Sequence, residues 1–147
     1  MKLLPLLAGL LIGVPVLAQT NLLVTPEEAQ ASMAAGELPT PRNAPQPGAP
    51  KIELLSPDIR KPFSAPANIE LRFSGNSPAE PQPESFKALY GTFRIDITQR
   101  LLKYAKVTKD GISVSNADLP AGKHQLTLTL TDTLGRQTQQ VVSFVVQ

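Results

Sequence analysis

The feature that most restricts the fold is a strict alternation of side chains near the C-terminus. Residues 126–131 read LTLTLT, so in an extended strand every leucine falls on one face and every threonine on the other. The turn-forming run LPAG precedes the strand at 119–122, and DTLG follows it at 132–135. The chain then alternates again through residues 138–146. The pattern predicts an antiparallel hairpin with leucines on a buried face and threonines on a solvated one.

The returning strand of this hairpin has an outer face unlike that of its partner. If Val142 and Phe144 point into the core, Val141 and Val145 must point away from it, because side chains alternate along a strand. Three interpretations stay open: a loop or the N-terminal helix, through Leu22, Leu23 or Met33, covers the valines, they contact a partner or a second copy, or they are simply exposed. Val141 and Val145 are therefore candidate contact residues, and self-association is one of the alternatives.

The same alternation begins at residue 51 and predicts further strands. It is visible at 52–54, 69–73, 86–90, 93–97 and 112–114. Gly91 is either a hairpin turn or a bulge in one bent strand. Residues 97–105 favour a short helix, with Thr98 as its N-cap, where the chain would cross between sheets. Residues 51–147 are thus predicted to form an all-β antiparallel sandwich with one short helical segment in a crossover.

Two stretches carry a resemblance to a known family. LPAGKHQLTLTLTDTLGR with the later VSFVV resembles the last two strands of bacterial immunoglobulin-like domains, and IELLSPDIRKPFSAPANIELRFSG is similar to their first two strands. The resemblance implies an immunoglobulin-like (Ig-like) antiparallel β-sandwich. The same ends of the domain also resemble periplasmic copper-binding sandwiches of the CopC type, which implies the same general fold.

The CopC resemblance does not extend to a metal site. That family depends on histidines, one of them at the mature N-terminus, whereas Gln19 is the first residue expected here after cleavage. His124 is the only histidine in the chain, and Arg136 stands where that family has a histidine after the late glycine. Copper and zinc sites need several nitrogen or sulfur ligands. We therefore expect no metal site and no other cofactor, and a packing role for His124.

The sequence offers no catalytic grouping either. Nucleophilic triads need a histidine or cysteine beside the nucleophile, and the chain has one His and no Cys. Asp110 and Asp132 each precede a glycine in a turn, which favours a capping role over acid–base chemistry. Sugar cleavage also requires aromatic platforms, and the chain has no Trp. We expect no enzymatic activity.

Residues 1–18 have the layout of a secretory signal peptide. Lys2 precedes an apolar stretch, and the small Ala18 stands at its end. Pro5 and Pro15 interrupt the stretch, which is shorter than a membrane-spanning helix requires, so we expect no transmembrane segment after cleavage. An exported chain without cysteine is typical of bacterial envelope proteins, which predicts a periplasmic or secreted location.

Residues 19–50 are predicted to hold a short helix and a proline-rich linker. The run TPEE at 25–28 is a helix-start signature, and Gly36 is placed to end the helix. Prolines recur from 39 to 50 and predict an extended, semi-rigid linker. We interpret this segment as a tether before the sandwich of residues 51–147, the alternative being a peptide that docks on a partner.

Basic side chains gather between residues 94 and 109, with one tyrosine among them. The candidate contact residues there are Arg94, Arg100, Lys103, Tyr104, Lys106 and Lys109. A solvated basic face is one interpretation, and contact with an anionic partner such as lipopolysaccharide, acidic lipid or an acidic protein is the other. The formal net charge of +2 is too small for general nucleic-acid binding.

These patterns predict a non-catalytic, exported Ig-like binding or structural module of the bacterial envelope. Its expected partner is another envelope protein or an anionic envelope component. The alternative function is a ligand-binding accessory domain that recognises an anionic envelope component through the basic segment 94–109.

Overall fold

A computed structural model describes Gly13, residues 21–39 and residues 46–147. Apart from Gly13, the expected signal peptide of residues 1–18 lies outside the described residues, as does part of the proline-rich linker. The described elements follow in the order β1 (Asn21–Leu22), α1 (Pro26–Ala35), β2 (Lys51–Ser56), β3 (Ala67–Ser74), β4 (Pro81–Tyr90), β5 (Ile95–Asp96), α2 (Thr98–Tyr104), β6 (Ala105–Thr108), β7 (Gly111–Asp118), β8 (Gly122–Asp132) and β9 (Gln137–Val146).

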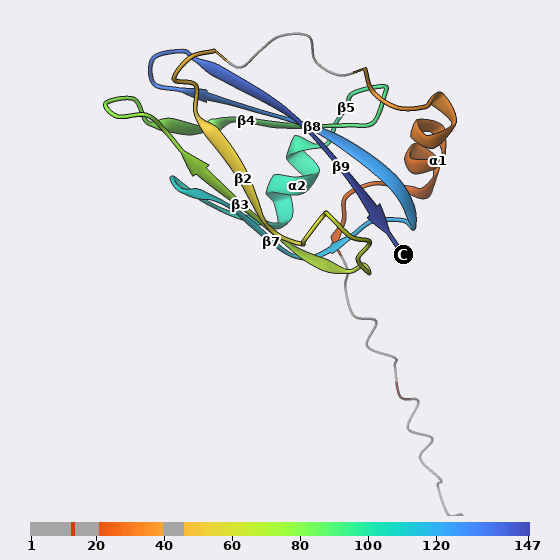
Figure 1. The fold of residues 1–147 in the computed structure, drawn as a ribbon. Helices are drawn as coiled ribbons and strands as arrows, with labels where there is room; N and C mark the ends of the chain where they lie inside the picture. The colour runs from red at the N-terminus through yellow and green to blue at the C-terminus, as the bar shows by residue number, and fades with distance from the viewer. Residues whose placement is uncertain (1–12, 14–20, 40–45) are drawn as a thin grey trace, which may run out of the picture.

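The strands form two sheets that enclose one core (Figure 1). One sheet has the order β1-β7-β3-β2, with β6 also paired to β7, and the other has the order β5-β4-β8-β9. Pairings among the long strands are antiparallel, whereas β1 joins β7 in parallel. The orders β2-β3-β7-β6 and β5-β4-β8-β9 correspond to the A-B-E-D and C′-C-F-G orders of an Ig-type sandwich. The predicted all-β sandwich is confirmed.

The C-terminal hairpin pairs regularly, from Gly122 opposite Val146 to Thr131 opposite Gln137, with no register shift. Its turn depends on Asp132, whose carboxylate accepts the backbone N–H groups of Leu134 and Arg136 at 2.9 Å each and Nε of Arg136 at 2.8 Å. Burial by itself would raise the pKa of Asp132, but these hydrogen bonds outweigh it and hold the pKa below its ordinary value.

The outer face of β8 differs from the solvated face expected. Thr127 and Thr129 are buried. β8 is an inner strand, and Thr127 lies between Leu89 of β4 and Val141 of β9 in the pairing register. The neighbouring strands on both sides therefore enclose the threonines. The alternation identified the two faces of the strand but not their exposure.

α2 is the predicted helical segment in the crossover, because β5 before it and β6 after it belong to different sheets. The helix lies between the sheets in Figure 1, and its Leu101 is buried. The expected N-cap was wrong by one residue. Ile97 takes that position, and the carboxylate of Asp96 accepts the N–H of Thr98 at 2.9 Å. The Thr98 hydroxyl instead accepts the N–H of Ala88 in β4 at 2.9 Å, which fixes the helix to the sheet.

Gly91 forms a hairpin turn between β4 and β5. Its φ is 66°, and its carbonyl accepts the N–H of Arg94 at 3.1 Å. The turn interrupts the alternation expected for residues 93–97, so Phe93 is exposed at its tip. A Cβ at position 91 would collide with Ser32 of α1, so glycine is needed both for the positive φ and for the close approach of the helix.

α1 starts and ends as the sequence indicates. Thr25 Oγ1 accepts the N–H of Glu28 at 3.2 Å, and the N–H of Thr25 donates to a Glu28 carboxylate oxygen at 3.0 Å, which completes a capping box. Gly36, with φ of 87°, follows the last helical residue. A helix of 10 residues is marginal in isolation, so tertiary packing must hold it in place.

That packing differs from the tether expected for residues 19–50. β1 adds to the sheet beside β7, and Leu23, Val24 and Ala29 belong to the same buried cluster as the sandwich residues. α1 lies against β8 (Figure 1). The part of the segment from 21 to 36 is therefore joined to the core of the sandwich.

Candidate functional site

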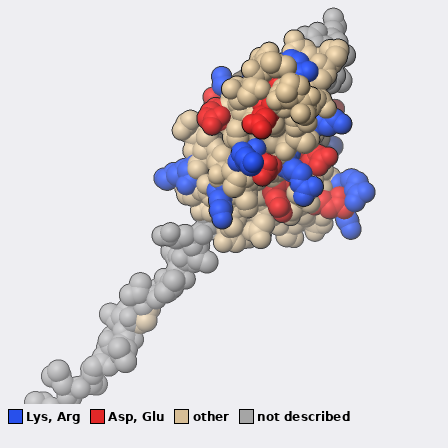
Figure 2. Space-filling model, turned by 90° about the vertical axis from the view of Figure 1, so that its left-hand side faces the viewer, with Lys and Arg blue, Asp and Glu red and all other residues tan. Residues whose placement is uncertain are grey.

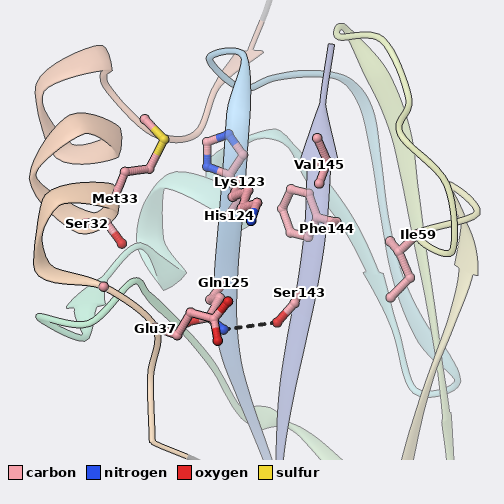
Figure 3. A pocket seen from close by; sticks show the side chains of 11 residues that line it. Ser32, Met33, Glu37, Ile59, Lys123, His124, Gln125, Ser143, Phe144 and Val145 are labelled. Atoms are coloured by element: carbon pink, nitrogen blue, oxygen red, sulfur yellow. Dashed lines mark hydrogen bonds between the residues drawn. The ribbon is translucent and has the colours of Figure 1, made fainter.

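A groove of about 550 Å³ runs beside the C-terminal hairpin, between α1 and the connection from β2 to β3 (Figure 3). The docking of α1 creates one wall of the groove, and the strands β8 and β9 form its base. Its lining residues are Ser32, Met33, Gly36, Glu37, Ile59, Lys123, His124, Gln125, Ser143, Phe144 and Val145.

The groove combines apolar walls with a polar border. Met33 of α1 and Val145 of β9 are 43% and 37% exposed, and Ile59 adds a third apolar side chain. Glu37 and Lys123 place opposite charges at the same groove. An exposed apolar centre with charged groups around it is the usual composition of a protein contact site.

Polar contacts fix the hairpin and the end of α1 relative to each other. Gln125 donates from Nε2 to the Ser143 hydroxyl at 3.2 Å, as the dashed line in Figure 3 marks. Its Oε1 accepts the N–H of Leu38, just after α1, at 2.7 Å. One side chain thus holds β9 and the chain after α1, so the width of the groove is set by bonded groups.

A buried polar pair lies under the groove. His124 Nε2 is 2.6 Å from the carbonyl oxygen of Pro120, which can only accept, so Nε2 carries the proton. Nδ1 then accepts the hydroxyl proton of Tyr90 at 2.7 Å, and the imidazole stacks on Phe144 with ring centroids 5.4 Å apart. Both ring nitrogens are engaged inside the protein, so His124 has the packing role that the sequence indicates.

The charge state of this pair follows from its burial. Burial lowers the pKa of His124, against the opposite effect of the hydrogen bond to Pro120, so the imidazole is neutral at neutral pH. Burial raises the pKa of Tyr90, with a further contribution from the charge of Glu28, and a hydrogen bond with Ser32 opposes both. Tyr90 therefore stays a protonated donor to His124.

Arg100 serves an internal role that the sequence did not reveal. Its guanidinium bonds both carboxylate oxygens of Glu28, at 2.7 and 2.8 Å, and also donates to the carbonyl oxygen of Leu23 at 3.4 Å. The hydrogen bond from Arg100 is the main cause that lowers the pKa of Glu28, and burial opposes it. The pair ties α2 to α1, so Arg100 differs from the other basic residues of its segment.

Those other residues come from separate elements. Arg94 is in the β4–β5 turn at a φ of 52°, Lys103 and Tyr104 end α2, Lys106 is in β6, and Lys109 is in the turn before β7. The ammonium of Lys103 lies 5.5 Å from the ring centroid of Tyr104. Lys106 borders a second groove that also contains Glu70 and Asp110. On the face in Figure 2, basic and acidic side chains are interspersed.

The two valines lie in different surroundings on the outer face of β9. Val141 is half-buried beside Thr127, whereas Val145 lines the groove with Met33. The sequence named Met33 as a residue of the N-terminal helix that could cover the valines, and Met33 does line the groove with Val145, but sequence patterns missed Ile59, Glu37 and Lys123. No local signal could have found them, because the groove exists only once α1 docks on the hairpin.

Two further observations concern the described residues. Within 21–39 and 46–147, no three His, Asp or Glu side chains come together as a set of metal ligands. In the same part of the chain, neither helix has the length and apolar character needed to cross a bilayer.

No family model and no curated protein matches the chain. Among solved structures, the chain is similar to the crystal structure of CopC from Methylosinus trichosporium OB3b, with a TM-score of 0.45 and 16% sequence identity. The match covers 66% of this chain and 94% of that chain. The resemblance to CopC-type sandwiches seen in the sequence thus recurs in the structure comparison. At this sequence identity and TM-score, neither a metal site nor a function can be assigned to the chain from the comparison.

Proposed function

We propose that the protein is an exported, non-catalytic binding module of the bacterial envelope, and that it holds a segment of another envelope protein in the groove beside the C-terminal hairpin. The observation that carries the proposal is the pair Met33 and Val145. These two exposed apolar side chains come from distant parts of the sequence and line one groove. The signal-peptide pattern of residues 1–18 supports export.

The groove suits an apolar anchor side chain with polar neighbours. Complete burial of an exposed aliphatic side chain contributes about 1.5–3 kcal/mol, and Met33, Ile59 and Val145, which are already partly buried, would each contribute a fraction of that. Glu37 and Lys123 would orient the bound segment, because charges at the border of an interface act more on specificity than on affinity.

Site-directed capture from envelope extract of the native host tests this proposal. Val145→Glu places a charge in the apolar part of the groove. The matched control is Leu134→Glu, which changes another exposed aliphatic residue at the far end of the same hairpin. A photo-reactive amino acid at Met33 identifies proteins that contact the groove directly.

The expected result is a partner that cross-links to position 33 and is retained by the wild type and by Leu134→Glu, but is lost with Val145→Glu. Thermal melting of all variants checks that they fold. If the same proteins are captured by both glutamate variants, the groove is not the binding site.

A second proposal keeps the basic segment as a contact for an anionic envelope component. It is supported by the exposed pair Lys103 and Tyr104, which presents a cation beside an aromatic ring at the end of α2. The test changes Lys103 and Lys106 to Glu and leaves Arg100 intact, because Arg100 holds α1. Sedimentation with anionic liposomes should fall, and its salt dependence should weaken. Unchanged sedimentation would leave only a solvated basic face.

A further inference from the structure

Among the described residues, β9 is an end strand with little of the usual protection of sheet edges. Residues 137–147 read QTQQVVSFVVQ, with no charged residue and no proline, and the pairing with β8 contains no bulge. Natural end strands are normally shielded by charge, proline, a bulge or a covering segment. The end strand β2 carries Lys51 and Glu53, and β6 carries Lys106. β9 is therefore chemically suited to pair with another strand.

Hydrogen bonds at the two ends of β9 show which backbone groups point away from β8. The N–H of Gln137 donates to Gln46 Oε1 at 3.1 Å. At the other end, the carbonyl of Val145 accepts the N–H of Phe63 at 3.1 Å, and the N–H of Gln147 donates to the carbonyl of Phe63 at 2.9 Å. The odd-numbered residues of β9 thus direct their backbone groups outward.

Gln139, Val141 and Ser143 must direct theirs the same way, because the direction alternates along a regular antiparallel strand. No described residue bonds the backbone N–H or C=O of these three residues. The free stretch from 139 to 143 is about 17 Å long at the usual rise of a strand. It is closed at one end by Gln46 and at the other by Phe63.

A groove of about 430 Å³ lies beside this free edge, between β9 and β2. Thr138 and Gln140 line it from β9, Ile52 lines it from β2 together with Lys51 and Glu53, and Ala49 and Pro50 line it from the segment just before β2. The even-numbered residues of β9 face inward, so a strand added to the edge would point alternate side chains into this groove. Its apolar wall favours apolar side chains at those positions.

We propose that the edge of β9 from Gln139 to Ser143 takes up a short extended peptide segment of a partner protein as a further strand. The peptide would place apolar side chains toward Ile52 and polar ones toward solvent. Phe63 already extends the same edge by a parallel bridge to Val146, so the added strand continues an existing ladder. Ser143 borders both this site and the groove beside α1, but the edge site uses the backbone groups of β9, and its apolar wall is the separate groove at Ile52.

The occupant is a short segment and not β9 of a second copy. If β9 of two copies paired edge to edge, each strand would continue past the free stretch in both directions. Each would then meet the groups that close the edge, Gln46 at residue 137 and Phe63 at residue 145. A peptide of about five residues fits between these limits, since each residue advances a strand by about 3.3 Å.

The probe for the test is the five-residue peptide acetyl-TLTLT-amide, whose alternation copies residues 127–131 of β8, the strand that β9 pairs with on its other side. Hydrogen exchange is followed by NMR on the ¹⁵N-labelled mature protein. The amides of Gln139, Val141 and Ser143 should exchange rapidly in the free protein and about tenfold more slowly with saturating probe. Rapid exchange at these positions with about 1 mM probe present would overturn the proposal. So would slow exchange in the free protein, because the edge would already be covered.

Val141→Pro isolates the backbone contribution. It removes an N–H that points away from β8, so the pairing within the hairpin is kept, and proline is tolerated at such edge positions. Val141→Thr is the matched control, since it keeps the N–H and the β-branched shape. Affinity for the probe should fall at least about tenfold with the proline and stay within about twofold with the threonine. Equal affinities would refute strand addition.

Two measurements distinguish strand addition from a folding defect and from self-association. A probe N-methylated on alternate residues lacks the donors for the ladder and should bind the wild type at least about tenfold more weakly, so the test stands even if Val141→Pro fails to fold. Analytical ultracentrifugation identifies a second copy as the occupant. Wild-type dimers that disappear with Val141→Pro would overturn the peptide proposal.

Discussion

Leu23→Ala should destabilise the sandwich, although Leu23 stands in the segment that the sequence marks as a tether. The side chain is 2% exposed and belongs to the buried cluster shared with both sheets. It also lines an apolar cavity of about 50 Å³, which the substitution would enlarge. Core changes from leucine to alanine cost about 2–5 kcal/mol, and we expect about 3 kcal/mol here.

Leu22→Ala is the matched control for this change. Leu22 is the neighbouring residue, at the end of β1, and is 44% exposed. Removal of its side chain should cost less than about 0.5 kcal/mol, as for most surface positions. The two variants have the same composition and differ only in which leucine is truncated, so their difference measures burial.

Urea and thermal unfolding of the mature chain measure the effect. A loss of about 3 kcal/mol corresponds to a fall in Tm of roughly 10 °C for a domain of this size. The urea midpoint should fall with the m value unchanged. Small and equal effects of the two substitutions would refute the reasoning and restore the tether. Deletion of residues 19–50 would then leave the melting transition intact, whereas the packing of Leu23 predicts that the deletion weakens it.

Three further outcomes are expected. Glu28→Gln should cost no more than about 1 kcal/mol, because Arg100 is partly exposed and the pair is screened by solvent; a double-mutant cycle with Arg100→Gln that gives no coupling energy would contradict the pairing. Burial lowers the pKa of His124 below its unfolded value of about 6.5. As the pH falls, the unfolded state therefore binds the proton before the folded state does. The contribution of neutral His124 to stability is complete above about pH 6.5 and declines below it. Tm should therefore fall as the pH is lowered from about 7.5 to 5.5, and the fall should be smaller for His124→Asn. An equal fall in Tm for the wild type and the variant would show that the pH dependence does not come from His124. Intact-mass measurement of the native protein should place its N-terminus at Gln19, and retention of Met1 would exclude signal cleavage.

Elements that depend on neighbouring residues could be predicted from the sequence. The hairpin of β8 and β9 follows from its alternation and from the turn at Asp132, and α1 follows from its capping box and Gly36. In each case the decisive contacts join residues a few positions apart, so the linear pattern contains them. The sandwich class follows from the same alternation, because strands with one apolar face must bury it against another layer.

Contacts between distant segments were decided only by the tertiary structure. Alternation assigned Thr127 to an outer face, but the side chains of the neighbouring strands buried it. Charge in the segment 94–109 suggested a contact surface, and the fold paired Arg100 with Glu28 instead.

The same distinction applies to the candidate sites. The sequence by itself determined the two strands of the C-terminal hairpin, the capping box of α1 and the uncharged character of β9. Only the fold placed Met33 of α1 beside Val145 and left the edge at Val141, between Gln46 and Phe63, without a hydrogen bond from any described residue. The physical reason is that local periodicity determines the direction of each side chain, whereas the group that covers it comes from another part of the chain.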